Sequence, residues 1–201
     1  MGIATFASQA LEDFQSTAAI APSSRFLAEA MVDPLPLSSA KVVVELGPGT
    51  GVMTRELLRR MRFDAKLLAF EVSPRFINYL GENISDPRLE VVPVGAENIV
   101  DELASRGIHR SEAVLSSLGL TLMPFDVVDA VLAGSQQLVG DTGVFTQFQY
   151  VHRVRVQNCR PVYFDVAKWL RKRFPVVGRR MIVRNLPPAF VYDCRNRPAS
   201  A

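Results

Sequence analysis

The stretch KVVVELGPGTG, residues 41–51, decides the fold. Its apolar run Val42–Val44, continued by Leu46, predicts a strand that is covered on both faces, because apolar and polar residues do not alternate there. An acid and three glycines at alternate positions follow, and a helical pattern then runs from Val52 to Met61. A strand, a glycine turn and a helix in this order are typical of the nucleotide-binding corner of an α/β sheet.

The composition bounds the class of protein. The chain has 201 residues, of which 48% are hydrophobic, enough for one domain with a substantial core. No window of about 18 uninterrupted apolar residues occurs, and the N-terminus lacks the pattern of a signal peptide. Cys159 and Cys194 are neither spaced as metal ligands nor numerous enough for a disulfide framework. We expect a single intracellular domain, 1–201, without a metal site or a membrane span.

The net charge of +3 conceals an asymmetry along the chain. Residues 1–150 carry 11 Lys and Arg against 18 Asp and Glu, whereas residues 151–201 carry 12 against 2. A basic region of this density favours an anionic partner. Nucleic acid, an anionic membrane and the acidic body of the same protein all remain open.

Strand and helix patterns alternate after residue 41, as in a doubly wound sheet. We expect an α/β fold with one open, mostly parallel sheet of seven strands and helices on both faces. The expected strands are 42–46, 67–72, 89–94, 113–117, 144–149, 176–183 and 190–192, and the expected helices are 52–61, 74–84, 97–106, 125–138 and 161–173.

The first 36 residues form a separate N-terminal segment in this interpretation, and 37–201 form the core. Between Phe6 and Ala18 the apolar and polar residues divide onto two faces at helical spacing, which predicts an amphipathic helix. The proline-rich stretch Asp33–Pro36 then breaks the helical pattern. The apolar face would ordinarily pack on the protein's own core, and a lid or a membrane contact is the alternative.

The glycine spacing distinguishes between two nucleotide-binding patterns. Val52 occupies the place where the dinucleotide fingerprint requires glycine or alanine. The form G-x-G-x-G, preceded by Glu45, resembles the first motif of the class I S-adenosylmethionine-dependent methyltransferases. The resemblance implies a Rossmann-like fold, with Glu45 near the methionine end of the cofactor. It also implies an acid at the end of the next strand for the ribose hydroxyls, and LLAFEVSP supplies Glu71 about twenty residues after the loop.

Two later stretches extend this resemblance. VVPVGAENI would lie against the adenine, although Glu97 could equally cap the following helix, and AVLSSLGL places Ser116 and Ser117 beside the transferred methyl group. The product of the cofactor would be S-adenosyl-L-homocysteine. The residues expected to bind S-adenosyl-L-methionine are Glu45, Gly47, Gly49, Gly51, Glu71, Ser73, Gly95, Ala96, Glu97 and Ser116.

A narrower resemblance covers nearly the whole chain. The stretches IAPSSRFLAEAMVDPL, ELGPGTGVMT, AFEVSP, SSLGLTLMP and RNLPPAFVY are similar to the bacterial phospholipid N-methyltransferases. Membership would imply methyl transfer to the amine of phosphatidylethanolamine and of its mono- and dimethylated forms, towards phosphatidylcholine. The protein would then be cytoplasmic and peripherally associated with the inner face of the membrane.

The acceptor site is predicted near the end of the fifth strand. Tyr150 would contact the forming cation and His152 would accept a proton, or both would merely end the strand. Ser24, Arg25 and Arg184 are candidates for the lipid head group and its phosphate, although an arginine could equally pair with an acid. The residues expected to contact an anionic membrane are Arg171, Lys172, Arg173, Arg179 and Arg180.

Three other functions compete with a lipid methyltransferase. The same sequence resembles the rRNA adenine dimethylases, which hold the target amine with an Asn-Leu-Pro-aromatic motif at the end of the fourth strand. This chain has SSLGLTLMP there, and its Asn185-Leu186-Pro187 comes much later. A small-molecule methyltransferase would leave the basic tail without a role. A cofactor-binding protein without catalysis is the third alternative, and no stable nucleic-acid partner is expected.

Overall fold

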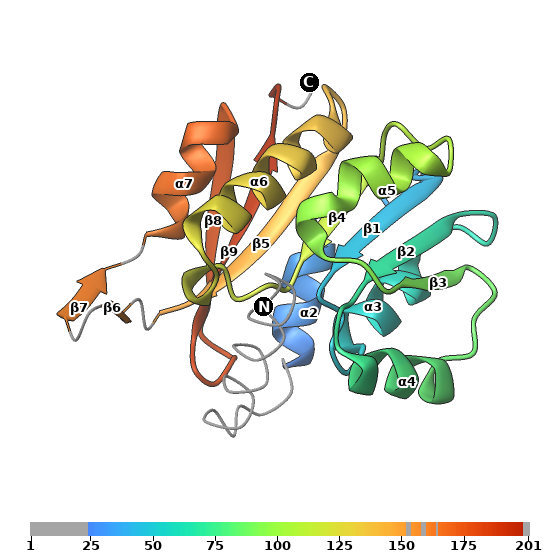
Figure 1. Cartoon of the computed structure of the whole chain (residues 1–201), viewed down its shortest axis with the longest axis horizontal. Coiled ribbons are helices and arrows are strands. Elements are labelled where there is room, and N and C mark those ends of the chain that lie inside the picture. The colour runs from blue at the N-terminus through green and yellow to red at the C-terminus, as the bar shows by residue number, and fades with distance from the viewer. Residues whose placement is uncertain (1–23, 152–153, 158–159, 164, 199–201) are drawn as a thin grey trace.

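The computed structural model describes residues 24–151, 154–157, 160–163 and 165–198 (Figure 1). Its main feature is a seven-stranded sheet in the order β3-β2-β1-β4-β5-β9-β8, which confirms the expected open α/β sheet. No helix among these residues has both the length and the apolar character needed to cross a membrane. The strands of the sheet are β1 (Val42–Leu46), β2 (Lys66–Phe70), β3 (Leu89–Val92), β4 (Ala113–Ser116), β5 (Val144–Tyr150), β8 (Val176–Ile182) and β9 (Ala189–Arg195).

Strand direction gives the sheet two distinct edges. β1 to β5 are parallel to one another, β9 is antiparallel to β5, and β8 is antiparallel to β9. We call the edge at which β1 to β5 end the carboxyl edge. Ala189 pairs with both Tyr150 and Ile182, so the turn between β8 and β9 also lies at the carboxyl edge. Ligands of open α/β sheets bind outside this edge.

Helices cover both faces of the sheet (Figure 1). One face is packed by α2 and α3, and the other by α5, α6 and α7, with a cluster of buried apolar side chains beneath each set. The helices are α2 (Arg25–Val32), α3 (Val52–Arg60), α4 (Pro74–Asn83), α5 (Ile99–Ser105), α6 (Phe125–Val139) and α7 (Val166–Arg173), with 3₁₀ turns η1 (Ala96–Asn98) and η2 (Leu120–Leu122).

Helix α2 belongs to the core. Five of its eight residues are buried, and it packs against α3, β5, β8 and β9. Helix α2, which lies within the described part of the N-terminal segment (residues 24–36), therefore contributes to the domain's stability. The amphipathic stretch Phe6–Ala18 lies outside the described residues, so its role as a lid or membrane contact stays a prediction.

The expected helix 161–173 is wrong in its first part. Residues Arg160–Tyr163 form strand β7, which pairs with β6 (Val154–Gln157) in a separate two-stranded sheet. The helix begins only at Val166, where the side chain of Asp165 accepts a hydrogen bond from the Ala167 N–H at 3.0 Å. The β-branched residues of VRVQ and PVY favour strand pairing, and Asp165 is a strong N-cap, so local chemistry explains the boundary.

Candidate functional site

The glycine loop between β1 and α3 lies at the carboxyl edge and has an unusual backbone. Gly47, Gly49 and Gly51 have φ angles of 73°, 54° and 76°, a region that residues with a side chain rarely adopt. A Cβ on Gly47 would lie 2.8 Å from the Leu118 side chain, and a Cβ on Gly51 would lie 2.7 Å from Ile84. Both the conformation and the space therefore require glycine at these two positions.

Glu71 fixes the position of this loop. Its Oε2 accepts a hydrogen bond from the Gly49 N–H at 3.1 Å, and its Oε1 accepts from the N–H groups of Val72 and Ser73, each at 3.0 Å. Glu71 is 2% exposed, and burial raises its pKa against the opposing effect of these three hydrogen bonds. A carboxylate offers about four acceptor positions, so one remains for a ligand hydroxyl beside the loop.

Glu45 is fully buried at the end of β1. Its Oε2 accepts a hydrogen bond from the hydroxyl of Thr54 on α3 at 2.7 Å, whereas its Oε1 has no hydrogen-bond partner among the described residues. Burial raises the pKa of Glu45 to about 8, the hydrogen bond from Thr54 lowers it, and the nearby charge of Glu71 raises it further. The acid next to the glycine loop is therefore protonated in much of the population at neutral pH.

The third part of the predicted cofactor site lies after β3. The Glu97 side chain folds back over Gly95, and its carboxylate lies where a side chain on Gly95 would be. Ala96 is buried, and Gly95 precedes the 3₁₀ turn η1. A side chain at position 95 would therefore displace the Glu97 carboxylate from this turn.

Two serines complete this edge of the sheet. Ser73 is 2% exposed at the start of α4, and its hydroxyl has no hydrogen-bond partner among the described residues. Ser116 is fully buried at the end of β4, where its hydroxyl accepts from the Leu118 N–H at 3.4 Å. All of the sequence-predicted cofactor residues thus lie at or shortly after the carboxyl ends of β1 to β4.

The polar atoms of this edge fit an adenosyl cofactor. A buried polar atom without a partner costs about 1–3 kcal/mol, and Glu45 Oε1 and Ser73 Oγ are both of this kind. Glu45 lies in β1 just before the glycine loop, and Ser73 lies two residues after Glu71, whose carboxylate accepts from the N–H of Gly49 in that loop. Acids, hydroxyls and bare backbone in this arrangement suit a ligand with ribose hydroxyls, a cationic centre and a flat base.

The middle of β5, level with the end of β4, carries a residue that the sequence interpretation missed. Gln147 is fully buried and is the register partner of Ser116. Its Nε2 donates to the carbonyl oxygens of Leu118 at 3.0 Å and Phe148 at 2.7 Å, while its Oε1 has no partner among the described residues. Glutamines inside the otherwise buried strand VFTQFQY are a signal that could have found it.

The predicted catalytic pair is described only in part. Tyr150 ends β5 and is half-buried, and its ring packs edge-on against Phe148 with 5.2 Å between the centroids. His152 lies outside the described residues. The roles of Tyr150 and His152 stay predictions.

The three predicted head-group residues come together from distant parts of the chain. Ser24 caps α2 by accepting from the Leu27 N–H at 3.3 Å, and its own N–H donates to Asn185 Oδ1 at 3.0 Å. The guanidinium groups of Arg25 and Arg184 each lie 5.3 Å from the centre of the Phe26 ring. Arg25 also forms an exposed ion pair with Glu29 at 3.9 Å.

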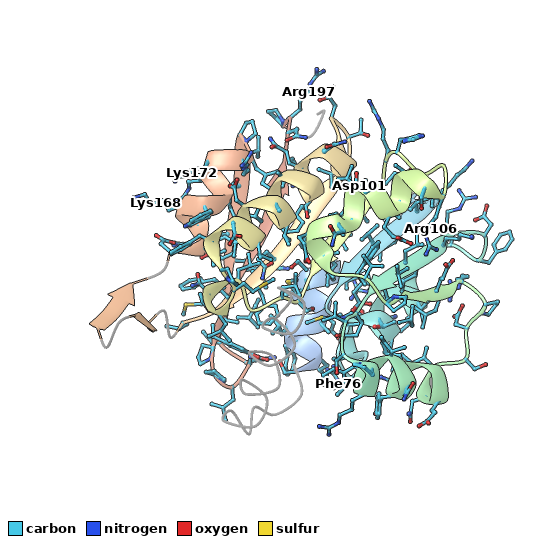
Figure 2. All side chains as sticks on the ribbon, in the orientation of Figure 1. Phe76, Asp101, Arg106, Lys168, Lys172 and Arg197 are labelled. Atoms are coloured by element: carbon cyan, nitrogen blue, oxygen red, sulfur yellow. The ribbon has the colours of Figure 1, made fainter. Side chains whose placement is uncertain are left out.

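The five residues predicted to contact a membrane do not form one surface. Arg173 forms an ion pair with Asp129 on α6, and Arg180 lies 3.5 Å from Asp33. Arg179 shares a sheet face with its register partner Tyr192, and Arg180 projects from the opposite face. Lys172 lies on the outer side of α7, 5.1 Å from the Trp169 ring (Figure 2).

Comparisons with known proteins bear on this site. A family model described as ribosomal RNA adenine dimethylase matches residues 23–96. An ornithine lipid N-methyltransferase from Singulisphaera acidiphila is 30% identical over 179 residues, which are 89% of this chain and 88% of that protein. This chain belongs to the same family as that N-methyltransferase. It is a class I S-adenosylmethionine-dependent methyltransferase.

Other relatives match a smaller part. The ribosomal RNA small subunit methyltransferase H of Bordetella petrii is 37% identical over 79 residues, and the match spans 22% of that protein. Among solved structures, a putative rRNA-methylase from Clostridium thermocellum superposes with a TM-score of 0.64 at 16% identity, covering 89% of this chain and 99% of that one.

A second solved structure has a bound product of the cofactor. The 1,6-didemethyltoxoflavin-N1-methyltransferase of Burkholderia thailandensis, solved with S-adenosylhomocysteine, has a TM-score of 0.65 at 18% identity, covering 96% of this chain and 88% of that one. These likenesses confirm the Rossmann-like methyltransferase fold. The cofactor of this methyltransferase is S-adenosylmethionine, as the sequence predicted.

The first prediction concerns the acid that braces the glycine loop. Glu71→Ala removes charged hydrogen bonds to the loop and an acceptor for the ribose, so we expect affinity for S-adenosylmethionine to fall by about 1–3 kcal/mol. Isothermal titration calorimetry measures this loss, with the exposed Glu82→Ala on α4 as a matched control. Equal affinities for the two variants would contradict the assignment.

The second prediction concerns the raised pKa of Glu45. Because the folded protein favours the neutral acid, ionisation of Glu45 costs stability as the pH rises from its ordinary pKa of 4.5 to about 8. Glu45→Gln keeps the neutral shape, so its advantage over wild type should grow across this range and reach about 2–4 kcal/mol at pH 9. Denaturant unfolding of the ligand-free proteins at pH 5 and pH 9 measures it. A pH-independent difference would show that Glu45 ionises normally.

Proposed function

We propose that this methyltransferase transfers methyl groups to the amine of phosphatidylethanolamine and of its mono- and dimethylated forms, towards phosphatidylcholine, at a membrane surface. The observation that carries the proposal is the match to the ornithine lipid N-methyltransferase. It extends over both the cofactor half of the chain, which ends with β4, and the acceptor half, which begins after β4 and contains β5. The rRNA adenine dimethylase match ends at residue 96, before β4 and β5. It therefore supports the cofactor and says nothing of the acceptor.

The choice of head group rests on shared chemistry. Phosphatidylethanolamine joins a primary amine to a phosphate, and an ornithine head group joins a primary amine to a carboxylate. The two guanidinium groups on the Phe26 ring, together with Ser24 at the start of α2, are suited to either anion. The relative's name makes an ornithine lipid the second candidate substrate.

The chemical step makes particular demands on the protein. S-adenosylmethionine, when bound, supplies a methyl group on a sulfonium for direct displacement by a lone pair. The site must present the amine in its neutral form, in line, and without competing water. Gln147 Oε1 is a buried neutral acceptor whose orientation is fixed by two hydrogen bonds through Nε2.

Gln147 is suited to this task because its carbonyl is uncharged. A carboxylate at the same place would stabilise the protonated ammonium, which has no lone pair to react. The neutral amide oxygen of Gln147 can accept a hydrogen bond from the substrate amine and favours the ammonium form less than a carboxylate would. This hydrogen bond also directs the lone pair of the amine nitrogen away from Gln147. In this proposal Tyr150 contacts the cation as it forms, and His152 accepts the released proton.

The membrane surface is the partner that this function requires. The enzyme would associate with it peripherally, from the cytoplasmic side, because its substrate amine lies in the head-group layer. Basic side chains contribute about 1 kcal/mol each when they reach an anionic surface. Arg179 and Arg180 of β8 are candidates for this contact, as are Arg171, Lys172 and Arg173 at the end of α7.

The third prediction tests the acceptor. Purified protein is incubated with methyl-labelled S-adenosylmethionine and vesicles that contain phosphatidylethanolamine, with ornithine lipid vesicles and ribosomal RNA in parallel tubes. We expect label in phosphatidylethanolamine, because the five stretches quoted in the sequence analysis resemble the phospholipid N-methyltransferases, and the relative's name makes the ornithine lipid the alternative. Label in the ornithine lipid alone would change the head group, and label in RNA alone would overturn the proposal. Glu71→Ala serves as a control with an impaired cofactor site.

The fourth prediction tests Gln147. Gln147→Met keeps the volume and removes the acceptor oxygen, so we expect kcat/KM for the lipid to fall about tenfold to a hundredfold. Affinity for S-adenosylmethionine, measured by calorimetry, should stay within a factor of about two, which separates a positioning role from a general loss of folding. Unchanged kcat/KM would remove Gln147 from the acceptor site.

A further inference from the structure

Exposed apolar side chains gather at the turn between β8 and β9. We call residues 181–188 the β8–β9 tip. Met181, Val183 and Leu186 are 52%, 65% and 81% exposed, respectively. Single exposed apolar residues are common on soluble proteins, but three within six positions form a patch that indicates an interaction site.

Hydrogen bonds hold the tip in place. Asn185 is 4% exposed, and its Nδ2 donates to the Pro187 carbonyl at 2.7 Å while its Oδ1 accepts from the Ser24 N–H at the start of α2. The Val151 N–H donates to the Pro188 carbonyl at 3.0 Å. The exposed side chains are thus presented on a braced turn, and contact with a partner requires little ordering of the chain.

The charge around the tip selects an anionic partner. Residues 176–192 contain Arg179, Arg180 and Arg184 and no acidic residue. Arg184 has no ion pair among the described residues, and Arg25 lies against the same Phe26 ring. Three acids lie beside this region: Glu29 pairs with Arg25, and Asp33 and Asp193 line a hollow together with Arg179 and Arg180, so Arg184 is the arginine at the tip that these acids leave available. Apolar side chains flanked by arginines are suited to the interface of an anionic bilayer.

The position of the tip separates it from the basic end of α7. The tip lies at the carboxyl edge with the glycine loop, whereas Arg171–Arg173 precede β8 at its opposite end. The seven residues of β8 span about 20 Å, and charges are screened over about 8 Å at physiological salt. A membrane that touches the tip is therefore beyond the effective reach of Arg171–Arg173.

We propose that the β8–β9 tip seats the enzyme on an anionic lipid surface, with Val183 and Leu186 in the head-group layer and Arg184 on lipid phosphates. This orientation turns the carboxyl edge, and with it the cofactor loop and Gln147, toward the membrane. The choice of a lipid partner rests on the proposed function. The seating itself requires no methyl transfer.

The test uses the full chain and vesicles that lack an acceptor amine. Cosedimentation with phosphatidylglycerol and phosphatidylcholine vesicles, without S-adenosylmethionine, measures membrane affinity. We expect the double variant Val183→Ser/Leu186→Ser to bind at least tenfold more weakly than wild type, and Arg184→Gln about fivefold more weakly. Phe63→Ser is the matched control, because Phe63 is 89% exposed just before β2, at the opposite edge. Arg171→Gln/Lys172→Gln should bind as wild type does.

Three results would overturn the inference. The tip variants could bind as well as wild type, wild type could fail to bind, or the α7 variant could lose more binding than the tip variants do. Calorimetry with S-adenosylmethionine should give the tip variants wild-type affinity, which shows that they are folded.

Methyl transfer to a dispersed short-chain phosphatidylethanolamine separates this inference from the proposed function. If wild type methylates the dispersed lipid but does not bind vesicles, the membrane role of the tip is refuted and the proposed function is retained. If wild type binds vesicles through the tip but methylates no lipid, the membrane role of the tip is supported and the proposed methyl transfer to lipid is refuted.

Discussion

The bond between the Glu71 carboxylate and the Gly49 N–H is the constraint on which the site depends. It joins the end of β2 to the loop after β1, and the same carboxylate accepts from two further backbone N–H groups. The N–H groups of Gly47 and Gly51 donate to the backbone carbonyls of Phe70 and Pro48, whereas the N–H of Gly49 donates to the Glu71 side chain. The residue predicted to bind ribose is therefore also the residue that shapes the loop, and the two roles are inseparable in this fold.

The cofactor half could be predicted from sequence because its chemistry is local. The glycines, Glu45 and Glu71 lie at or near the carboxyl ends of β1 and β2. The carboxyl ends of parallel strands lie at the same edge of a sheet, whatever the details of packing. The strand and helix ranges were correct within a few residues for the same reason, since apolar runs and turn residues mark them. The exception is β6 and β7, two strands of four residues that pair in a separate sheet.

The acceptor half could not be predicted as well, because its contacts join residues that are distant in sequence. The Gln147 side chain is oriented by a hydrogen bond to the carbonyl of Leu118, and the Asn185 side chain accepts a hydrogen bond from the N–H of Ser24, 161 positions away. No local sequence pattern predicts such a pair. The five basic residues predicted to contact a membrane illustrate the same limit. Arg171, Lys172 and Arg173 end α7 before β8 begins, whereas Arg179 and Arg180 lie within β8 on opposite faces of the sheet.

The bond between Ser24 and Asn185 also constrains the order in which the chain acquires structure. α2 comes early in synthesis, yet much of its buried face rests on β5, β8 and β9, and its cap is tied to the final hairpin. Contacts of such sequence separation form late and slowly. On the ribosome, where residues nearer the N-terminus emerge first, α3 can cover part of the apolar face of α2, but the part that packs on β8 and β9 stays exposed until those strands emerge. The interval of exposure is therefore set by the 161 positions that separate Ser24 from Asn185.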